Sequence, residues 1–312
     1  MAKRIPAYRY TGVSRVEADS DYWYIYLTSP GKGKLTMEFD KKVDIFFVGG
    51  GGAGGSGNGA GGGGGGYVKT VSDTLEAGKE YVFSIGEGGI PAVWSSGGDG
   101  ESTYVLGTVT GVDAEGNETI AYKYGVEGGK GGNYSKKIVG DNKYDQDCPG
   151  GDGGSGGGAG TYTKGRDGGA GGSSGMPGGR TDAVGGTGSG VRSWAFAESA
   201  YPLYGGGGGG SSRNMAGGAG GAGGGGIGGS EDASGYEKDG GNGADNTGGG
   251  GGGASYNGLG GYGGSGVVII RGTELDFLPV FFDGTRVQQI FYNGQEVRAL
   301  TFNGVQLFSE GD

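Results

Sequence analysis

The first 126 residues carry short runs of aromatic and β-branched residues, which are typical of β-strands. These runs lie at 8–11, 23–28, 34–39, 67–84 and 102–124. Turn-forming residues connect them at 29–33, 76–79 and 113–117. Apolar residues at a 3.6-residue period never extend beyond two helical turns, so the pattern predicts an all-β fold.

Two apolar runs, at 43–48 and 266–271, frame the glycine-rich part of the chain. Of the 312 residues, 90 are glycine, and the glycine tracts begin directly after the first run and end directly before the second. Glycine loses more conformational entropy on folding than any other residue. The tracts are therefore either disordered or folded in a way that only glycine permits. Their position favours an ordered body between two neighbouring central strands.

Three structures can be considered for the tracts. Collagen is excluded, because residues 54–61 break the strict three-residue glycine period and the chain has only seven prolines. A flexible linker remains an alternative. The third structure is a bundle of polyglycine II-type helices with three residues per turn, whose helices hydrogen-bond one another.

A bundle of this kind is too weakly stable to fold alone and needs a β-sheet framework to hold its ends. Ordering a backbone costs about 1–2 kcal/mol per residue, whereas a hydrogen bond returns only about 0.5–1.5 kcal/mol. We therefore expect residues 1–272 to form an antiparallel β-sandwich that frames a body of polyglycine II-type helices and loops.

Residues 273–312 form a second region with a ten-residue repeat. Its Asp-Gly and Asn-Gly pairs suit two-residue type I′ hairpin turns. The pairs are Asp283-Gly284, Asn293-Gly294 and Asn303-Gly304. The spacing predicts a four-stranded β-meander. Because so small a sheet is only marginally stable alone, we expect this region to be an assembly or docking tail that uses Asn293, Gly294, Asn303 and Gly304.

The composition argues against enzymatic chemistry. The chain has no histidine, which removes histidine-based acid–base catalysis and histidine metal ligands. Its single cysteine, Cys148, allows neither an internal disulfide nor a cysteine-rich zinc site. A strand followed by a G-x-G-x-x-G pattern occurs at 43–54, but the helix that binds a dinucleotide cannot follow in such glycine-rich sequence. We expect no enzyme, no metal and no cofactor.

Charge and hydropathy limit the partners. A net charge of −10 disfavours binding to a nucleic-acid backbone. The longest apolar runs are far shorter than the roughly 20 residues that span a bilayer, and no targeting segment is recognised. The sequence therefore predicts neither nucleic-acid binding nor a membrane span.

Three segments together resemble the glycine-rich domain of bacteriophage tail and tail-fibre proteins. They are 8–12, 43–52 and 260–271, and the segments at 81–89 and 203–210 fit as well. The resemblance implies a virion structural protein, of the tail rather than the capsid, that is synthesised in the host cytoplasm. It also implies other virion proteins as partners, is compatible with a homo-oligomer, and brings no catalytic residues.

Polar-aromatic islands interrupt the glycine tracts at 133–147, 161–166, 191–204 and 231–239, and we expect them to project as recognition loops. Tyrosine with mixed charge suits host-surface glycans or protein loops. The candidate receptor-binding residues are Tyr134, Lys136, Tyr144, Asp145, Tyr236, Lys238 and Asp239. Two alternatives stay open: a purely architectural component such as a capsid decoration or head fibre, and a tailspike glycosidase, for which two carboxylates suffice.

Overall fold

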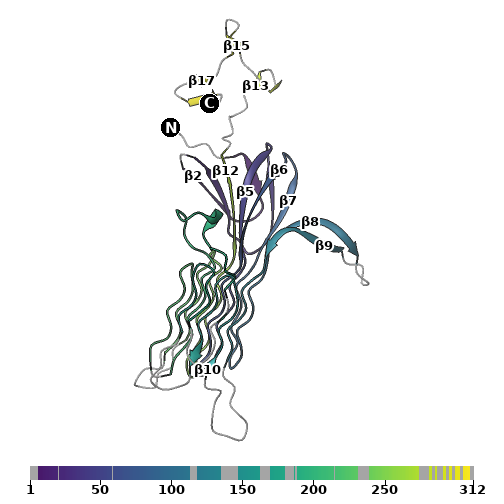
Figure 1. The fold of residues 1–312 in the computed structure, drawn as a ribbon. Helices are drawn as coiled ribbons and strands as arrows, with labels where there is room; N and C mark the ends of the chain where they lie inside the picture. Colours follow the sequence, from purple (N-terminus) through teal and green to yellow (C-terminus); the bar gives the residue numbers. More distant parts are fainter. Residues whose placement is uncertain are drawn as a thin grey trace.

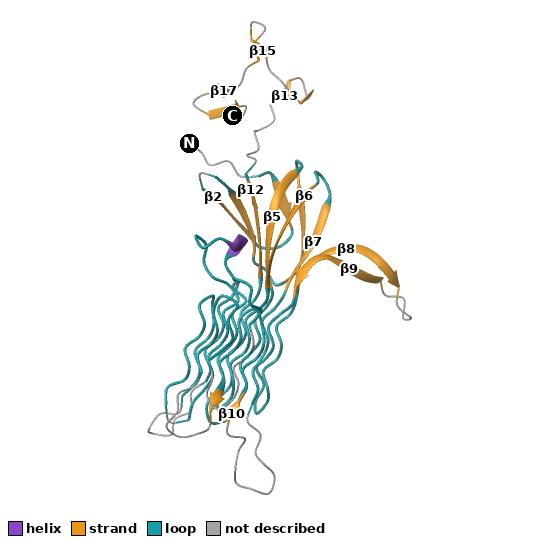
Figure 2. Ribbon diagram, viewed as in Figure 1, coloured by secondary structure: helices purple, strands orange, loops and turns teal. Residues whose placement is uncertain are grey.

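The computed structural model describes residues 6–273 except 20, 58, 113–117, 135–146, 162–168, 180–185, 187, 214 and 231–238, and short strands between 281 and 309. Two antiparallel five-stranded sheets form a sandwich, and a bundle of extended segments runs out from one end of it (Figures 1 and 2).

The first sheet has the order β1 (Tyr8–Tyr10), β4 (Gly31–Met37), β7 (Glu80–Ile85), β8 (Thr103–Val112) and β9 (Glu118–Val126). The second sheet has the order β2 (Ser14–Ala18), β3 (Trp23–Leu27), β12 (Val267–Gly272), β5 (Lys41–Val48) and β6 (Val68–Leu75). The antiparallel all-β fold predicted from the sequence is confirmed.

The main core lies between the two sheets. Alternate residues of β3, β5 and β12 face alternate residues of β4 and β7, as the two-residue period of a half-buried strand requires. The rings of Phe47 and Phe83 stack across the gap with their centroids 6.3 Å apart. The fully buried members include Trp23, Ile25, Leu27, Leu35, Met37, Phe83, Ile85 and Ile270.

The two apolar runs that frame the glycine tracts are neighbouring central strands, as predicted. β5 and β12 pair antiparallel, with Ile45 opposite Ile270 and Val48 opposite Val267. The tracts therefore leave the sandwich and return to it side by side, and the strand ends hold both ends of the bundle.

Two local details differ from the sequence-based expectations. The strand β2 (Ser14–Ala18), which pairs with β3 along the edge of the second sheet, was not identified from the sequence. The turn expected at 29–33 is shorter, because β4 already begins at Gly31, whose φ of 90° suits glycine alone. Gly33 is also a strand residue, and it gives room for the ring of Tyr10.

β8 and β9 form the hairpin expected around 113–117, with Val112 opposite Glu118. β8 pairs with β7 only through Tyr104 and Val105. Beyond that point the two strands leave the sandwich as a ribbon (Figure 1).

The tail contains three hairpins: β13 (Phe281–Phe282) with β14 (Thr285–Arg286), β15 (Phe291–Tyr292) with β16 (Gln295–Glu296), and β17 (Ala299–Phe302) with β18 (Val305–Ser309). Their closing pairs leave the two-residue connections that the Asp-Gly and Asn-Gly repeats predicted. Within the described part of the tail, strands of different hairpins do not pair. These six strands therefore form three separate hairpins and not the single four-stranded meander that the spacing predicted. Asn293, Gly294, Asn303 and Gly304 lie outside the described residues.

Candidate recognition surface

The glycine tracts form polyglycine II-type helices with a hydrogen-bond period of three. Along 49–56, every third amide donates to the same neighbouring segment, at 2.8–3.0 Å. One neighbour accepts through Tyr67, Gly64 and Gly61, a second through Glu101, Gly98 and Ser95, and a third through Gly264 and Gly261. A helix of three residues per turn presents its amides in three directions in this way.

The next segment follows the same rule. The amides of Gly61, Gly64 and Tyr67 donate to the carbonyls of 133, 130 and 127, and those of Gly63 and Gly66 donate to 251 and 248. The amides of 251 and 254 donate in turn to the carbonyls of 52 and 55 in the first segment, 49–56. Neighbouring segments thus bond one another on several sides, and the tracts form a folded body.

This packing leaves no room for a side chain at most interior positions of the bundle, and the few buried exceptions are small residues such as Ala53 and Ser155. A β-carbon on Gly63 would come within 3.0 Å of the Gly52 carbonyl oxygen, a separation that real β-carbons essentially never show. The same holds for Gly251 against Gly261 and for Gly208 against Gly251. Only glycine allows backbones to approach so closely.

The outer helices follow a pattern that the sequence analysis missed. Their side chains occur at every third position, so that one non-glycine residue alternates with two glycines. Examples are the exposed triplet positions Glu127, Lys130 and Asn133, and Ala216, Ala219 and Ala222. The interior tracts 61–66, 205–210 and 248–253 are glycine only, and all are buried. Triplets with a side chain thus mark surface helices, and uninterrupted glycine marks interior ones.

The loops between these helices gather at the end of the bundle away from the sandwich, which we call the far end. It comprises residues 55–57, 59–61, 160–161, 211–212 and 254–256, linked by backbone hydrogen bonds of 2.9–3.4 Å. β10 (Asp147–Cys148) and β11 (Gly160–Thr161) pair there (Figure 1).

The described ends of the predicted receptor-binding islands lie at this far end. Tyr134 is half-buried and follows Asn133, whose carbonyl accepts the Gly61 amide at 2.9 Å. Asp239 is exposed, and its Oδ1 accepts the amide of Leu259 at 2.8 Å. The other candidates lie outside the described residues: Lys136, Tyr144, Asp145, Tyr236 and Lys238.

Two further loops with exposed aromatic residues lie at the far end, and the sequence analysis missed them. Trp94 is 42% exposed in the loop 91–96, and Tyr256 is 38% exposed in the turn 255–258. Buried Ser56 holds both loops. Its amide donates to the Ser95 carbonyl at 2.9 Å, and its Oγ accepts the Gly260 amide at 2.9 Å. Because this last contact spans 204 residues, no local sequence signal could predict it.

The island at 191–204 does not project, contrary to the prediction. It lies on the outer face of the second sheet, where its short 3₁₀ turn η1 (Ala195–Ala197) buries Phe196. The ring of Tyr204 meets that of Phe46 edge-on with centroids 5.3 Å apart, and the hydroxyls of Tyr24 and Tyr201 lie 2.6 Å apart. The aromatic outer face of β3 and β5 explains this packing, since burying both surfaces is favourable.

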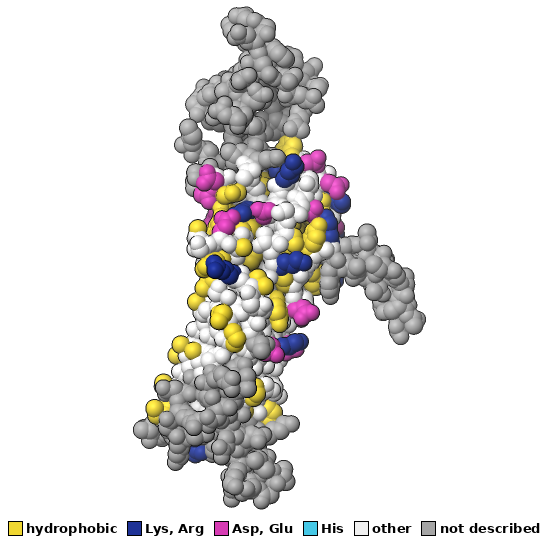
Figure 3. Space-filling model, viewed as in Figure 1, with side chains coloured by type: hydrophobic (Ala, Val, Ile, Leu, Met, Phe, Trp, Pro, Cys, Tyr) yellow, Lys and Arg dark blue, Asp and Glu magenta, His cyan; other side chains and the backbone are white. Residues whose placement is uncertain are grey.

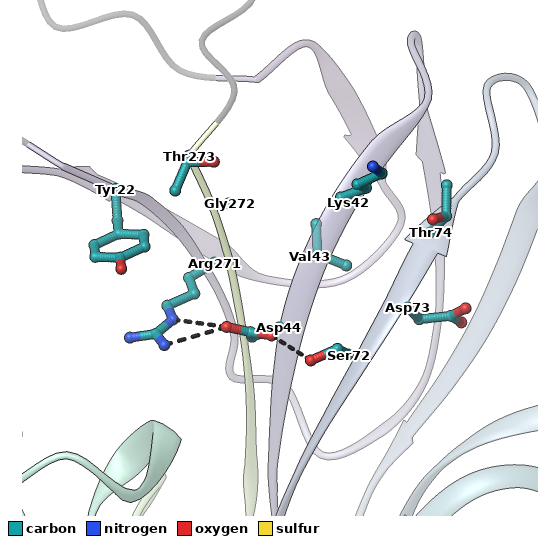
Figure 4. Close-up of a pocket in the computed structure, with 10 residues that line it drawn as sticks. All are labelled: Tyr22, Lys42, Val43, Asp44, Ser72, Asp73, Thr74, Arg271, Gly272 and Thr273. Atoms are coloured by element: carbon teal, nitrogen blue, oxygen red, sulfur yellow. Dashed lines mark hydrogen bonds and ion pairs between the residues drawn. The ribbon is translucent and has the colours of Figure 1, made fainter.

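An ion-pair network fixes this island to the sheet. Arg271 Nε and Nη2 donate to Asp44 Oδ2 at 3.2 and 3.1 Å, and Ser72 donates to Asp44 Oδ1 at 2.6 Å (Figure 4). The guanidinium also lies 2.8 Å from Glu198 of the island. Burial lowers the pKa of Arg271, but its hydrogen bonds with Glu198, Tyr201 and Asp44 outweigh that effect and raise the pKa overall. A small cleft of about 420 Å³ lies beside Arg271. Because Asp44 and Glu198 already neutralise the Arg271 guanidinium, its position in this cleft indicates that Arg271 has a structural role.

A comparison with protein families gives a match to one model, described as a glycine-rich domain, over residues 28–273. The chain belongs to this glycine-rich domain family. The matched region includes the bundle and most of the sandwich. No curated protein matches the chain.

Two further observations concern the described part of this glycine-rich domain. It contains no helix with the length and apolar character needed to cross a membrane. Its cysteine and acidic side chains form no group of three that could hold a metal ion.

Proposed function

We propose that the chain is a bacteriophage virion structural protein of the tail tip or tail fibre, and that the far end of its bundle contacts the host surface. The observation that carries the proposal is the convergence of so many loops on one end of a closely packed rod. The resemblance of segments 8–12, 43–52 and 260–271 to phage tail glycine-rich domains supports the virion assignment.

The bundle suits this task physically. Binding residues are most effective on loops that a rigid scaffold holds in place. Here each helix is bonded to several neighbours, so the described ends of the far-end loops are held firmly by the bundle. Tyr134, Trp94 and Tyr256 would supply broad aromatic contacts at low entropic cost, and Asp239 would supply charge.

A purely architectural role is the second candidate, and a specific observation favours it. Large apolar side chains are exposed along the sides of the bundle as well as at its far end. Ile227 is 61% exposed and Tyr262 is 47% exposed. Apolar residues in such positions are often covered by another protein. In Figure 3, most charged side chains lie over the sandwich and few over the bundle.

Phage particles that carry variants of this chain separate the two candidates. The far-end variant combines Trp94→Ala, Tyr134→Ala and Tyr256→Ala, and the side variant combines Ile227→Ser and Tyr262→Ser. If the far end binds the receptor, particles that carry the far-end variant should contain normal amounts of the protein. They should adsorb to the host at least about tenfold more slowly, because several aromatic contacts are lost. Normal adsorption of these particles, with loss of the side variant from virions, would favour the architectural role instead.

A further inference from the structure

A groove of about 730 Å³ lies where the sandwich meets the bundle. One side is the start of β6, the other is the end of β9, and the island at 191–204 forms the third wall. Volumes of this size are typical of small-ligand sites, which are mostly apolar with a few convergent polar groups. The groove is remote from the far end, so it is independent of the function proposed above.

The walls of the groove are held in place before any ligand arrives. Phe46, at the base, is only 1% exposed. Trp194 is bridged to Leu203 within the island, and the island itself is fixed to the sheet by the Arg271 network. A preformed site loses little conformational entropy on binding.

The apolar part of the groove offers aromatic surface. Trp194 is half-buried and Tyr67 is half-buried, so each ring keeps part of its surface accessible from the groove. Sugar rings present flat faces of C–H groups that pack against aromatic rings, while their hydroxyl groups project sideways toward polar side chains. This combination of apolar face and polar edge matches the lining of the groove.

The charged part of the groove selects the kind of sugar. Lys69 and Arg192 are both exposed at its rim, and neither forms an ion pair with a carboxylate in the described part of the chain. The Arg192 guanidinium lies 5.1 Å from the centre of the Trp194 ring, which positions it beside the aromatic wall. In a chain of net charge −10, two cations without an ion-pair partner at one groove favour an anionic ligand.

The carboxylate of Glu127 further restricts the chemical class of ligand that the groove can bind. Its exposed side chain lines the same groove. A carboxylate accepts hydrogen bonds from hydroxyl groups but repels other carboxylates. A ligand in which hydroxyl groups outnumber carboxylates therefore fits better than an acidic peptide. We propose that this groove binds an acidic saccharide, with its carboxylate at Lys69 and Arg192 and a sugar ring on Trp194.

Titration calorimetry with trigalacturonate as the probe tests this site, with the uncharged galactotriose as the comparison. The full chain should bind trigalacturonate at least about tenfold more tightly than galactotriose, as loss of a charge-assisted contact implies. Lys69→Gln and Arg192→Gln should each weaken binding about three- to tenfold. Lys32→Gln removes the same charge from an exposed position on β4 and should leave binding unchanged.

The aromatic wall is tested by a pair of variants that separates binding from folding. Trp194→Phe keeps a ring and should retain most of the affinity, whereas Trp194→Leu should lose it; thermal melting of both variants verifies the fold. In a Trp94→Phe background, trigalacturonate should protect Trp194 fluorescence from iodide quenching, because the remaining Trp23 is fully buried. The proposal is overturned by equal affinity for the two sugars, by binding that Lys69→Gln and Arg192→Gln do not alter, or by equally tight binding of a hexaglutamate peptide.

Discussion

The backbone of Gly63 lies so close to the carbonyl oxygen of Gly52 that a β-carbon on Gly63 would come within 3.0 Å of it. Gly52 in turn accepts the amide of Gly251 at 2.9 Å. The three segments therefore pack as bare backbones, and the identity of these glycines determines the stability of the bundle.

Substitution of an interior glycine should destabilise the protein strongly. Gly63→Val forces apart backbones that have no void to accept the side chain, and it should lower the free energy of unfolding by at least about 2 kcal/mol. Ala219→Val, on an exposed triplet position of an outer helix, is the matched control and should change it by less than about 0.5 kcal/mol. Urea denaturation measures both, and small, equal changes would contradict close packing.

The ion pair between Arg271 and Asp44 should matter more than an exposed one. Arg271→Met leaves Asp44 and Glu198 without their cation, and we expect a loss of about 2 kcal/mol, less than for a fully buried pair because both carboxylates are partly exposed. Lys34→Met removes the cation of the exposed pair with Glu80 and should cost at most about 0.5 kcal/mol. Similar losses in the two variants would show that the Arg271 network does not hold the island at 191–204.

The sequence predicted the parts of the fold that depend on local pattern. The apolar runs of β5 and β12 identify central strands because both faces of those strands are covered, and the Asp-Gly and Asn-Gly pairs mark the hairpins because their backbone requirement is local. The strand β2 was missed because its alternation, in Ser14–Ala18, contains only one large apolar residue.

The candidate site was predictable only in part. The islands containing Tyr134 and Asp239 could be recognised as interruptions of glycine, but their meeting at the far end follows from hydrogen bonds between distant segments. The loops of Trp94 and Tyr256 are both bonded to Ser56, a contact between distant segments that no local pattern shows. The island at 191–204 carries the same kind of sequence as the others, but the aromatic outer face of the sheet and the Arg271 ion pairs hold it against the sandwich.

Stability should fall at high pH, and Tyr24 should account for part of the fall. Burial, with further contributions from hydrogen bonds to Tyr201 and Asp19, raises the pKa of Tyr24 above its usual value near 10. The unfolded chain then loses this proton at a lower pH than the folded chain. The stability that Tyr24 contributes is thus fully present below about pH 10 and is lost as the pH rises above it, by up to about 1.4 kcal/mol per pH unit.

The variant Tyr24→Phe tests this assignment. Its free energy of unfolding should fall less steeply between pH 9 and 11.5 than that of the unmodified protein, even though the variant is less stable at pH 8. Tyr8→Phe is the control, and it should follow the unmodified protein. A parallel decline of all three proteins would contradict a role of Tyr24 in the pH dependence.

The tail should be separable from the body. Deletion of residues 274–312 should leave the melting temperature of the sandwich and bundle within a few degrees of its original value, because β12 ends at Gly272. The truncated chain should nevertheless be depleted from virions if the tail serves assembly. In the full chain, Gly294→Val should have the same effect, since a type I′ turn requires φ > 0 at that position. Normal incorporation of the truncated chain would exclude the tail from assembly.

Hydrogen exchange of the glycine amides tests the central claim most directly, namely that the tracts form an ordered scaffold for the far-end loops. Every amide of 61–66 and of 205–212 donates to a backbone carbonyl at 2.7–3.0 Å. We predict that these amides exchange as slowly as those of β5 and β12, and far more slowly than those of the exposed turn at 76–79. Complete exchange of the tracts within seconds, beside protected strands, would show that they are a flexible linker and would contradict this account.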